Sequence, residues 1–157
     1  MEVPGARLYY ETHGSGPLLL LIPGAPGVAD VYRAVTQHLT AHFTVAVYDR
    51  RGFSRSLLEG SQDYGRRLET DADDAHRLIE HLGAEPAIVF GASSGAVVGL
   101  ELLARHPSAI RTLIPYEPPA MRHSSGHSES ETGVPVCRSS VRSYLPELRW
   151  PRCSRWP

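Results

Sequence analysis

The sequence predicts an α/β fold, a mostly parallel β-sheet with flanking helices. Over the first 120 residues, short apolar runs that suit strands alternate with segments of helical periodicity. The run at residues 18–22 is apolar at every position, which is typical of a strand buried on both faces. A chain of 157 residues with 41% hydrophobic side chains can also form one domain with a real core.

The first half of the pattern predicts three strands and one short helix. Residues 7–12 are predicted as a strand, followed by a Gly-rich turn over residues 13–16. The apolar strand at 18–22 ends at a Pro-Gly pair, which cannot continue it. A short helix is predicted at 31–39, and a strand at 43–48 that ends in a charged loop.

The second half predicts two helices and two strands. Apolar residues recur at helical spacing from Leu68 to Leu82, and Gly83 is typical of a helix end. Thr70 and Asp73 resemble a capping box near the start of this helix. A strand is predicted at 87–90, a helix at 96–105 and a last strand at 110–116.

Composition and charge exclude several function classes. The 16 basic and 17 acidic side chains nearly cancel, which argues against nucleic-acid binding, and every basic residue is Arg, which excludes lysine chemistry. The apolar runs are far shorter than the ~20 residues of a membrane span, and the N-terminus does not resemble a signal peptide. Cys137 and Cys153 are too few for a disulfide scaffold or a Cys-based zinc site. We therefore expect a cytoplasmic protein with no cofactor and no metal.

Composition changes abruptly near residue 120. All Ala, Asp, Ile and Phe residues lie in residues 1–120, whereas residues 121–157 are rich in Ser, Arg and Pro. Such a composition buries too little apolar surface to offset the entropy of ordering. The segment 121–157 is therefore interpreted as either a disordered tail or a stretch not native to the fold, produced by truncation or a change of reading frame.

The sharpest motif is GASSG at residues 91–95, which matches G-x-S-x-G. An apolar strand runs directly into it and an apolar helix runs directly out, which is the setting of a nucleophile elbow. At such an elbow the serine, here Ser93, stands clear of the sheet. The small residues Gly91 and Gly95 let the strand and the helix pass closely.

Three motifs together resemble the N-terminal part of the α/β-hydrolase fold. The sequence LLIPGAPG at 20–27 resembles the family's H-G-x-P loop, and DRRGFSRS at 49–56 is similar to its D-x-R-G-x-G-x-S segment. The elbow is the third motif, and the order of the three agrees with the family. Two positions depart from the pattern: Pro23 stands where the family has His, and Ser54 where it has Gly. The fold implied is a truncated α/β-hydrolase fold.

The resemblance implies a role for each matching residue. Ser93 would be the nucleophile, the backbone amides of Ala25 and Ser94 would form the oxyanion hole, and Gly24 would allow the backbone to approach. Glu117 follows the sixth strand of the family's order, where some members carry the catalytic acid. A base is needed as well, and the candidates after the elbow are His123 or His127.

A serine at the elbow, where other members carry Asp, favours cleavage of an ester or a related acyl substrate, a small molecule. The alternative is a catalytically incomplete fragment or a non-catalytic relative that acts as a binding or dimerisation module. A third hypothesis, an RNA-binding tail, is disfavoured because the arginines are dispersed.

A metal site at Asp71, Asp73, Asp74 and His76 is disfavoured because acidic residues are ordinary in a helix's first turn. His76, His81 and His106 are expected to face solvent. The strand at 110–116 is expected to be an exposed edge of the sheet that promotes self-association.

Overall fold

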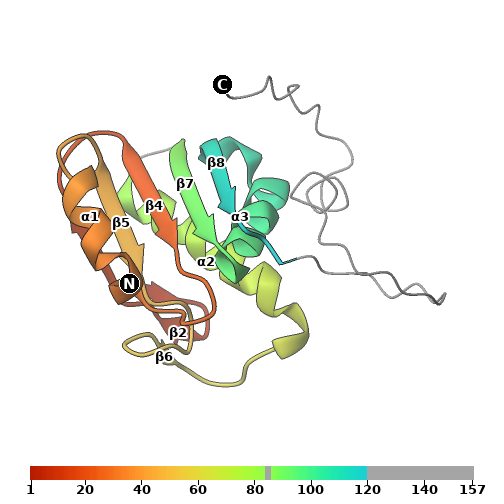
Figure 1. Ribbon diagram of the computed structural model, residues 1–157. Coiled ribbons are helices and arrows are strands. Elements are labelled where there is room, and N and C mark those ends of the chain that lie inside the picture. The colour runs from red at the N-terminus through yellow and green to blue at the C-terminus, as the bar shows by residue number, and fades with distance from the viewer. Residues whose placement is uncertain (84–85, 120–157) are drawn as a thin grey trace, which may run out of the picture. The chain divides into compact units, whose positions relative to one another are not determined.

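Five strands form the central sheet of the computed structural model, which describes residues 1–83 and 86–119 (Figure 1). In spatial order they are β3 (Tyr10–His13), β5 (Thr44–Tyr48), β4 (Leu18–Ile22), β7 (Ala87–Ala92) and β8 (Ile110–Tyr116). Strand β3 is antiparallel to β5, and the other four strands are parallel. The mostly parallel sheet predicted from the sequence is thus confirmed.

The helices and a small second sheet complete the described part of the chain. The α-helices are α1 (Arg33–Leu39), α2 (Arg67–Leu82) and α3 (Ser94–Arg105), and the 3₁₀ helices are η1 (Ala29–Tyr32), η2 (Tyr64–Arg66) and η3 (Pro107–Ala109). The three-stranded sheet consists of β1 (Glu2–Val3), β2 (Ala6–Arg7) and β6 (Leu57–Leu58). No helix in residues 1–83 and 86–119 has the length and hydropathy of a membrane span.

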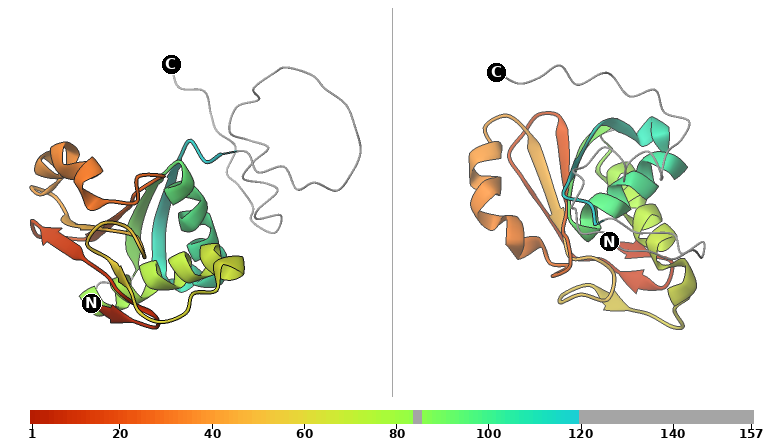
Figure 2. Two further views of the ribbon diagram at one scale, coloured as in Figure 1. Left: turned by 90° about the horizontal axis from the view of Figure 1, so that it is seen from below. Right: turned by 45° about the vertical axis from the view of Figure 1, so that its right-hand side comes forward.

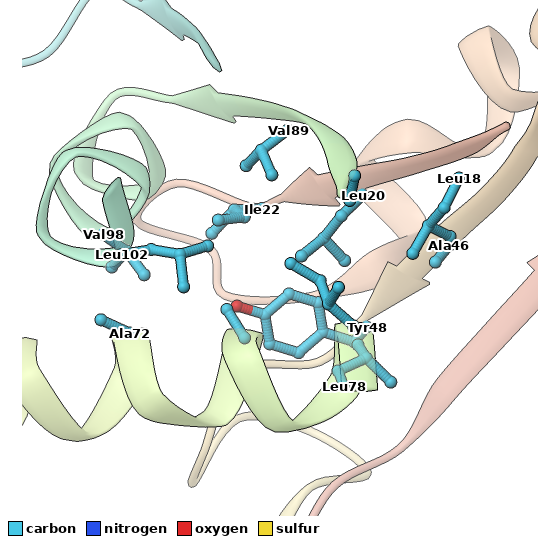
Figure 3. Packing of buried hydrophobic residues seen from close by; sticks show 13 residues of the cluster. Leu18, Leu20, Ile22, Ala46, Tyr48, Ala72, Leu78, Val89, Val98 and Leu102 are labelled. Carbon is cyan, nitrogen blue, oxygen red and sulfur yellow. The ribbon is translucent and has the colours of Figure 1, made fainter. Parts of the chain in front are cut away.

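The alternation of side chains along β4 divides the core into two layers. Leu18, Leu20 and Ile22 pack with apolar residues of α2 and α3, such as Leu78 and Leu102 (Figure 3). The intervening leucines of β4 pack on the opposite face with residues of η1 and α1. Helix α1 therefore covers one face of the sheet and helices α2 and α3 cover the other, as the right-hand view of Figure 2 shows. This explains why every residue of β4 is apolar.

The predicted strand at 7–12 is wrong, because the chain changes partners in its middle. The backbone of Leu8 pairs with Met1, and the Tyr9 amide donates to the Ser56 hydroxyl at 2.9 Å. The segment is therefore divided between β2 in the small sheet and β3 in the central sheet.

The predicted capping box is also wrong. Helix α2 begins at Arg67, so Thr70 lies inside it, and its hydroxyl donates to the Arg66 carbonyl at 2.9 Å. Asp73 instead accepts two hydrogen bonds from the Arg105 guanidinium of α3. The predicted end of the helix is confirmed, because Gly83 adopts a left-handed conformation with φ 66°.

Strand β8 is an edge of the sheet among the described residues. Its partner there is β7, and two of its large apolar side chains are exposed, Ile114 by 46% and Tyr116 by 55%. The expectations for residues 121–157, including those for His123 and His127, lie outside the described residues.

Candidate active site

A sharp corner joins β7 to α3 at Ser93. This residue has φ 51° and ψ −120°, a conformation that L-residues rarely adopt, and its side chain is exposed. The crossing is as tight as the motif predicts. A Cβ atom on Gly91 would lie 2.3 Å from the Gly95 carbonyl oxygen, and one on Gly95 would lie 2.3 Å from that of Ile22. The Ser93 amide donates to the Tyr116 carbonyl at 2.8 Å, which ties the corner to β8.

The loop after β4 lies directly against this corner. A Cβ atom on Gly24 would lie 2.8 Å from the Ala92 carbonyl oxygen and 3.3 Å from the Ser93 Cβ, so glycine allows the two backbones to lie this close. In the part of the chain that the structure describes, no loop or cap hydrogen bond uses the amide of Ala25 or of Ser94. Within the described residues, neither amide has a backbone acceptor among these bonds.

The side chain of Arg50 contacts both the Ser93 corner and the loop after β4. Its guanidinium donates to the Ser94 hydroxyl at 3.1 Å and to the Gly24 carbonyl at 3.4 Å. The same group forms a buried ion pair with Asp71 of α2. Sequence reasoning missed this role, although the position of Arg50 in the 49–56 motif was a signal that it lies near the site.

The acidic residues of α2 are structural partners of arginines. Asp74 accepts two hydrogen bonds of 2.8 Å from Arg51, and its carboxylate is almost fully buried. The helix dipole therefore does not explain Asp71 and Asp74, because each neutralises an arginine of the loop after β5. No group of three or more His, Cys, Asp or Glu within the described ranges is arranged to bind a metal.

Asp49 organises the loop between β5 and β6. Its buried carboxylate accepts hydrogen bonds from the Ala29 amide at 2.7 Å and from the Arg55 guanidinium at 2.7 and 2.9 Å. Burial by itself raises the pKa of Asp49, but these hydrogen bonds outweigh it and hold the pKa below its ordinary value. The Ser56 hydroxyl donates to the Asp49 carbonyl at 2.6 Å and accepts the Tyr9 amide. The loop's shape is thus fixed by polar contacts.

Three aromatic rings lie near the carboxyl ends of the strands. The Tyr32 hydroxyl donates to the Ile22 carbonyl at 2.8 Å, and burial raises its pKa to about 12, so it stays protonated. Tyr32 packs edge-on against Phe90, which in turn stacks on Tyr116 at 6.2 Å. The row of rings thus runs from η1 to Tyr116, whose backbone carbonyl accepts from the Ser93 amide.

Glu117 follows β8 at the same end of the sheet. Tyr116 of β8 pairs with Ala92 of β7. Glu117 and Ser93 are the residues that directly follow this pair. It has φ 48°, and the other described non-glycine residues with positive φ are Ser54 and Ser93. Strained backbone of this kind gathers at functional sites. The Glu117 side chain is exposed.

The described histidines make their contacts away from the corner. His106 lies 2.8 Å from an Asp73 oxygen, and its ring stacks on that of His76 at 3.8 Å. These two rings are partly buried, so the expectation that they face solvent is wrong. Exposed His81 contacts Tyr10. Among the described residues, no histidine hydrogen-bonds the Ser93 hydroxyl.

Comparison with known proteins agrees with this architecture. A model of the alpha/beta hydrolase fold family matches residues 17–132, and the chain belongs to this family. The uncharacterized hydrolase YraK of Bacillus subtilis (strain 168) is 51% identical over 150 residues, which cover 94% of this chain and 55% of YraK. The zearalenone hydrolase of Cladophialophora bantiana is 32% identical over 120 residues, covering 73% of this chain and 44% of that protein.

A solved structure gives the same result for the fold. The crystal structure of an alpha/beta hydrolase from Sphaerobacter thermophilus DSM 20745 matches with a TM-score of 0.65 and 34% identity, covering 77% of this chain and 45% of that one. This chain thus spans about half the length of the curated relatives it matches.

Proposed function

We propose that this chain carries the nucleophile and oxyanion half of a serine hydrolase that acts on an ester or a related acyl substrate. The observation that carries the proposal is the strained, exposed Ser93 at the corner between β7 and α3. A strained backbone that presents an exposed serine at a strand-to-helix corner is typical of a pre-organised nucleophile. The neighbouring amides of Ala25 and Ser94 support the same function.

In the proposed reaction, the Ser93 Oγ attacks the carbonyl carbon of the substrate while its proton passes to a base. The negative charge that develops on the carbonyl oxygen is stabilised by the amides of Ala25 and Ser94. The alcohol then leaves with a proton from that base, and water releases the acyl group from Ser93. We assign the base to His123 or His127 and the orienting carboxylate to Glu117.

Arg50 has a positioning role in this proposal. Its guanidinium contacts both Ser94 and Gly24, so it holds the two oxyanion segments at a fixed separation. Buried Asp71 neutralises the charge of Arg50, so this side chain can lie next to the site and position the two segments.

A fluorophosphonate probe tests the proposal, because it forms a covalent bond only with an activated serine. We expect labelling of the 157-residue chain, loss of labelling in Ser93→Ala, and unchanged labelling in Ser108→Ala, which alters an exposed serine after α3. A folded wild-type chain that takes no label would overturn the proposal and support the alternative, a non-catalytic relative.

A further inference from the structure

A cavity of about 320 Å³ lies apart from the candidate active site, at the N-terminal side of α2. Its walls come from the turn after β1, the loop after β6 and one face of α2. None of the residues of the Ser93 corner or of the loop after β4 lines it. Four arginines line it, Arg51, Arg66, Arg67 and Arg77, together with the polar side chains Gln62 and Thr70.

The arginines around this cavity outnumber the carboxylates that pair with them. Asp74 is shared by Arg51 and Arg77, at 2.8 and 3.5 Å. Asp71 is likewise shared by Arg67, at 2.9 Å, and by Arg50. Arg66 pairs with Glu69, so five arginines share three carboxylates and two positive charges are left over among these pairs. An excess of guanidinium groups in a cavity is suited to an oxyanion.

The two acidic side chains in the cavity wall already have partners. Asp73 accepts both hydrogen bonds of Arg105 at 3.0 Å, so its charge is balanced from α3. Asp63 accepts the Gly65 amide at 3.0 Å. The Gly65 amide carries no charge, so Asp63 reduces the positive excess around the cavity by one.

The groups that a ligand can reach lie on one face of α2 and in η2 just before it. Arg66 and Arg77 are exposed by 63% and 38% of their side chains, and Thr70 lies between them on the same face. This face begins at the first turn of a 16-residue helix, whose free amides and dipole favour negative charge. At the mouth of the cavity the Tyr64 ring is 68% exposed.

We propose that this cavity binds a small phosphate monoester, with the phosphate held by Arg77 and Arg67 and the organic group against Tyr64. One positive charge is left over after Asp71, Asp74, Glu69 and Asp63 are counted, which favours an anion, and phosphate oxygens can accept from more than one guanidinium. The volume exceeds the space a bare phosphate needs, which leaves room for an organic substituent.

Isothermal titration calorimetry of the full chain with phenyl phosphate tests this proposal, at an ionic strength held constant with chloride. We expect saturable binding that Arg77→Gln weakens by about tenfold, as loss of a charged hydrogen bond implies. Arg33→Gln removes a more exposed charge outside the cavity, and we expect the affinity of this variant to stay within about twofold of wild type.

Two further measurements separate the parts of the site. Inorganic phosphate alone is expected to bind more weakly than phenyl phosphate, and Tyr64→Ala should remove that difference. The absence of saturable binding by the folded wild-type chain would overturn the proposal. An equal loss of affinity in Arg77→Gln and Arg33→Gln would overturn it as well, because the charge effect would then be nonspecific.

Discussion

Ser54 adopts a backbone conformation that glycine reaches at lower cost. Its φ is 45°, its side chain is exposed, and it stands where the family pattern has Gly. The left-handed conformation brings Cβ close to the carbonyl oxygen and costs an L-residue about 1 kcal/mol. We predict that Ser54→Gly raises the free energy of unfolding by about 0.5–1 kcal/mol, measured by urea denaturation.

The control for this prediction is Ser54→Ala, which removes the hydroxyl and keeps Cβ. We expect it to leave the free energy of unfolding within about 0.5 kcal/mol of wild type. An equal gain in both variants would show that the hydroxyl, and not the backbone, is the source of strain.

At the scale of elements, β4, β7 and α3 can pack this closely only because the residues at their crossing are glycines. A Cβ atom on Gly95 would lie 2.3 Å from the Ile22 carbonyl oxygen, and backbone cannot move aside as a side chain can. We predict that Gly95→Ala lowers the free energy of unfolding by more than about 3 kcal/mol or prevents folding. Urea denaturation and circular dichroism measure this.

Gly99, one turn further along α3, is the matched control. The nearest atom to an added Cβ there is the end of the Leu113 side chain, at 2.9 Å, and this can rotate away. The gain in helix propensity offsets the contact, so we expect Gly99→Ala to change stability by less than about 1 kcal/mol. Similar losses for both substitutions would contradict the role of close backbone approach at Gly95.

The loop between β5 and β6 makes stability dependent on pH. The hydrogen bonds of Arg55 hold the pKa of buried Asp49 below its unfolded value of about 4. A carboxylate with a lowered pKa stabilises the fold above that unfolded value, and this contribution is lost as pH falls toward the folded pKa. We predict that Arg55→Gln lowers the free energy of unfolding by about 2 kcal/mol at pH 7, and by less at pH 4 and below.

Urea denaturation at a series of pH values measures this difference between the wild type and the variant. Arg33→Gln breaks an exposed pair with Asp30, at 3.2 Å, and should change stability by less than about 0.5 kcal/mol at every pH. A constant difference between wild type and Arg55→Gln from pH 7 to pH 3 would contradict the linkage to Asp49.

Across the whole molecule, the parts predicted from the sequence are those that local pattern determines. The apolar run of β4, the periodicity of α2 and the strand–turn–helix setting of Ser93 are each visible within about fifteen residues, and all appear in the structure. What the sequence did not reveal depends on distant partners. The pairs of Arg50 with Asp71 and Arg51 with Asp74 join residues 21 and 23 positions apart, and no local rule selects them.

The same reasoning explains the other errors. The backbone at Leu8 and Tyr9 looks like continuous strand because its side chains suit one. Its true partners, Met1 and Ser56, lie in segments that local periodicity does not connect. For the candidate site, the motifs predicted where Ser93 and Gly24 lie in the chain. The contacts of Arg50 with Ser94 and Gly24 became visible only in the tertiary structure.

Strand β8 links the fold to the behaviour of the whole chain in solution. Within residues 1–83 and 86–119 it pairs on one side with β7, and its apolar side chains Ile114 and Tyr116 are exposed. Unpaired strand backbone beside exposed apolar groups favours association with a second copy. We propose that the 157-residue chain self-associates through β8, and we predict that Ile114→Lys shifts sedimentation-velocity profiles at about 50 µM toward monomer.

Val35 of α1 separates edge pairing from general hydrophobic association. Its exposed fraction of 43% is close to the 46% of Ile114, but it lies on a helix and offers no strand backbone. If association depends on the strand edge, Val35→Lys should leave the sedimentation profile unchanged, while Ile114→Lys weakens association because a charge on an edge strand opposes pairing. A monomeric wild-type chain, or equal effects of the two substitutions, would contradict pairing through β8.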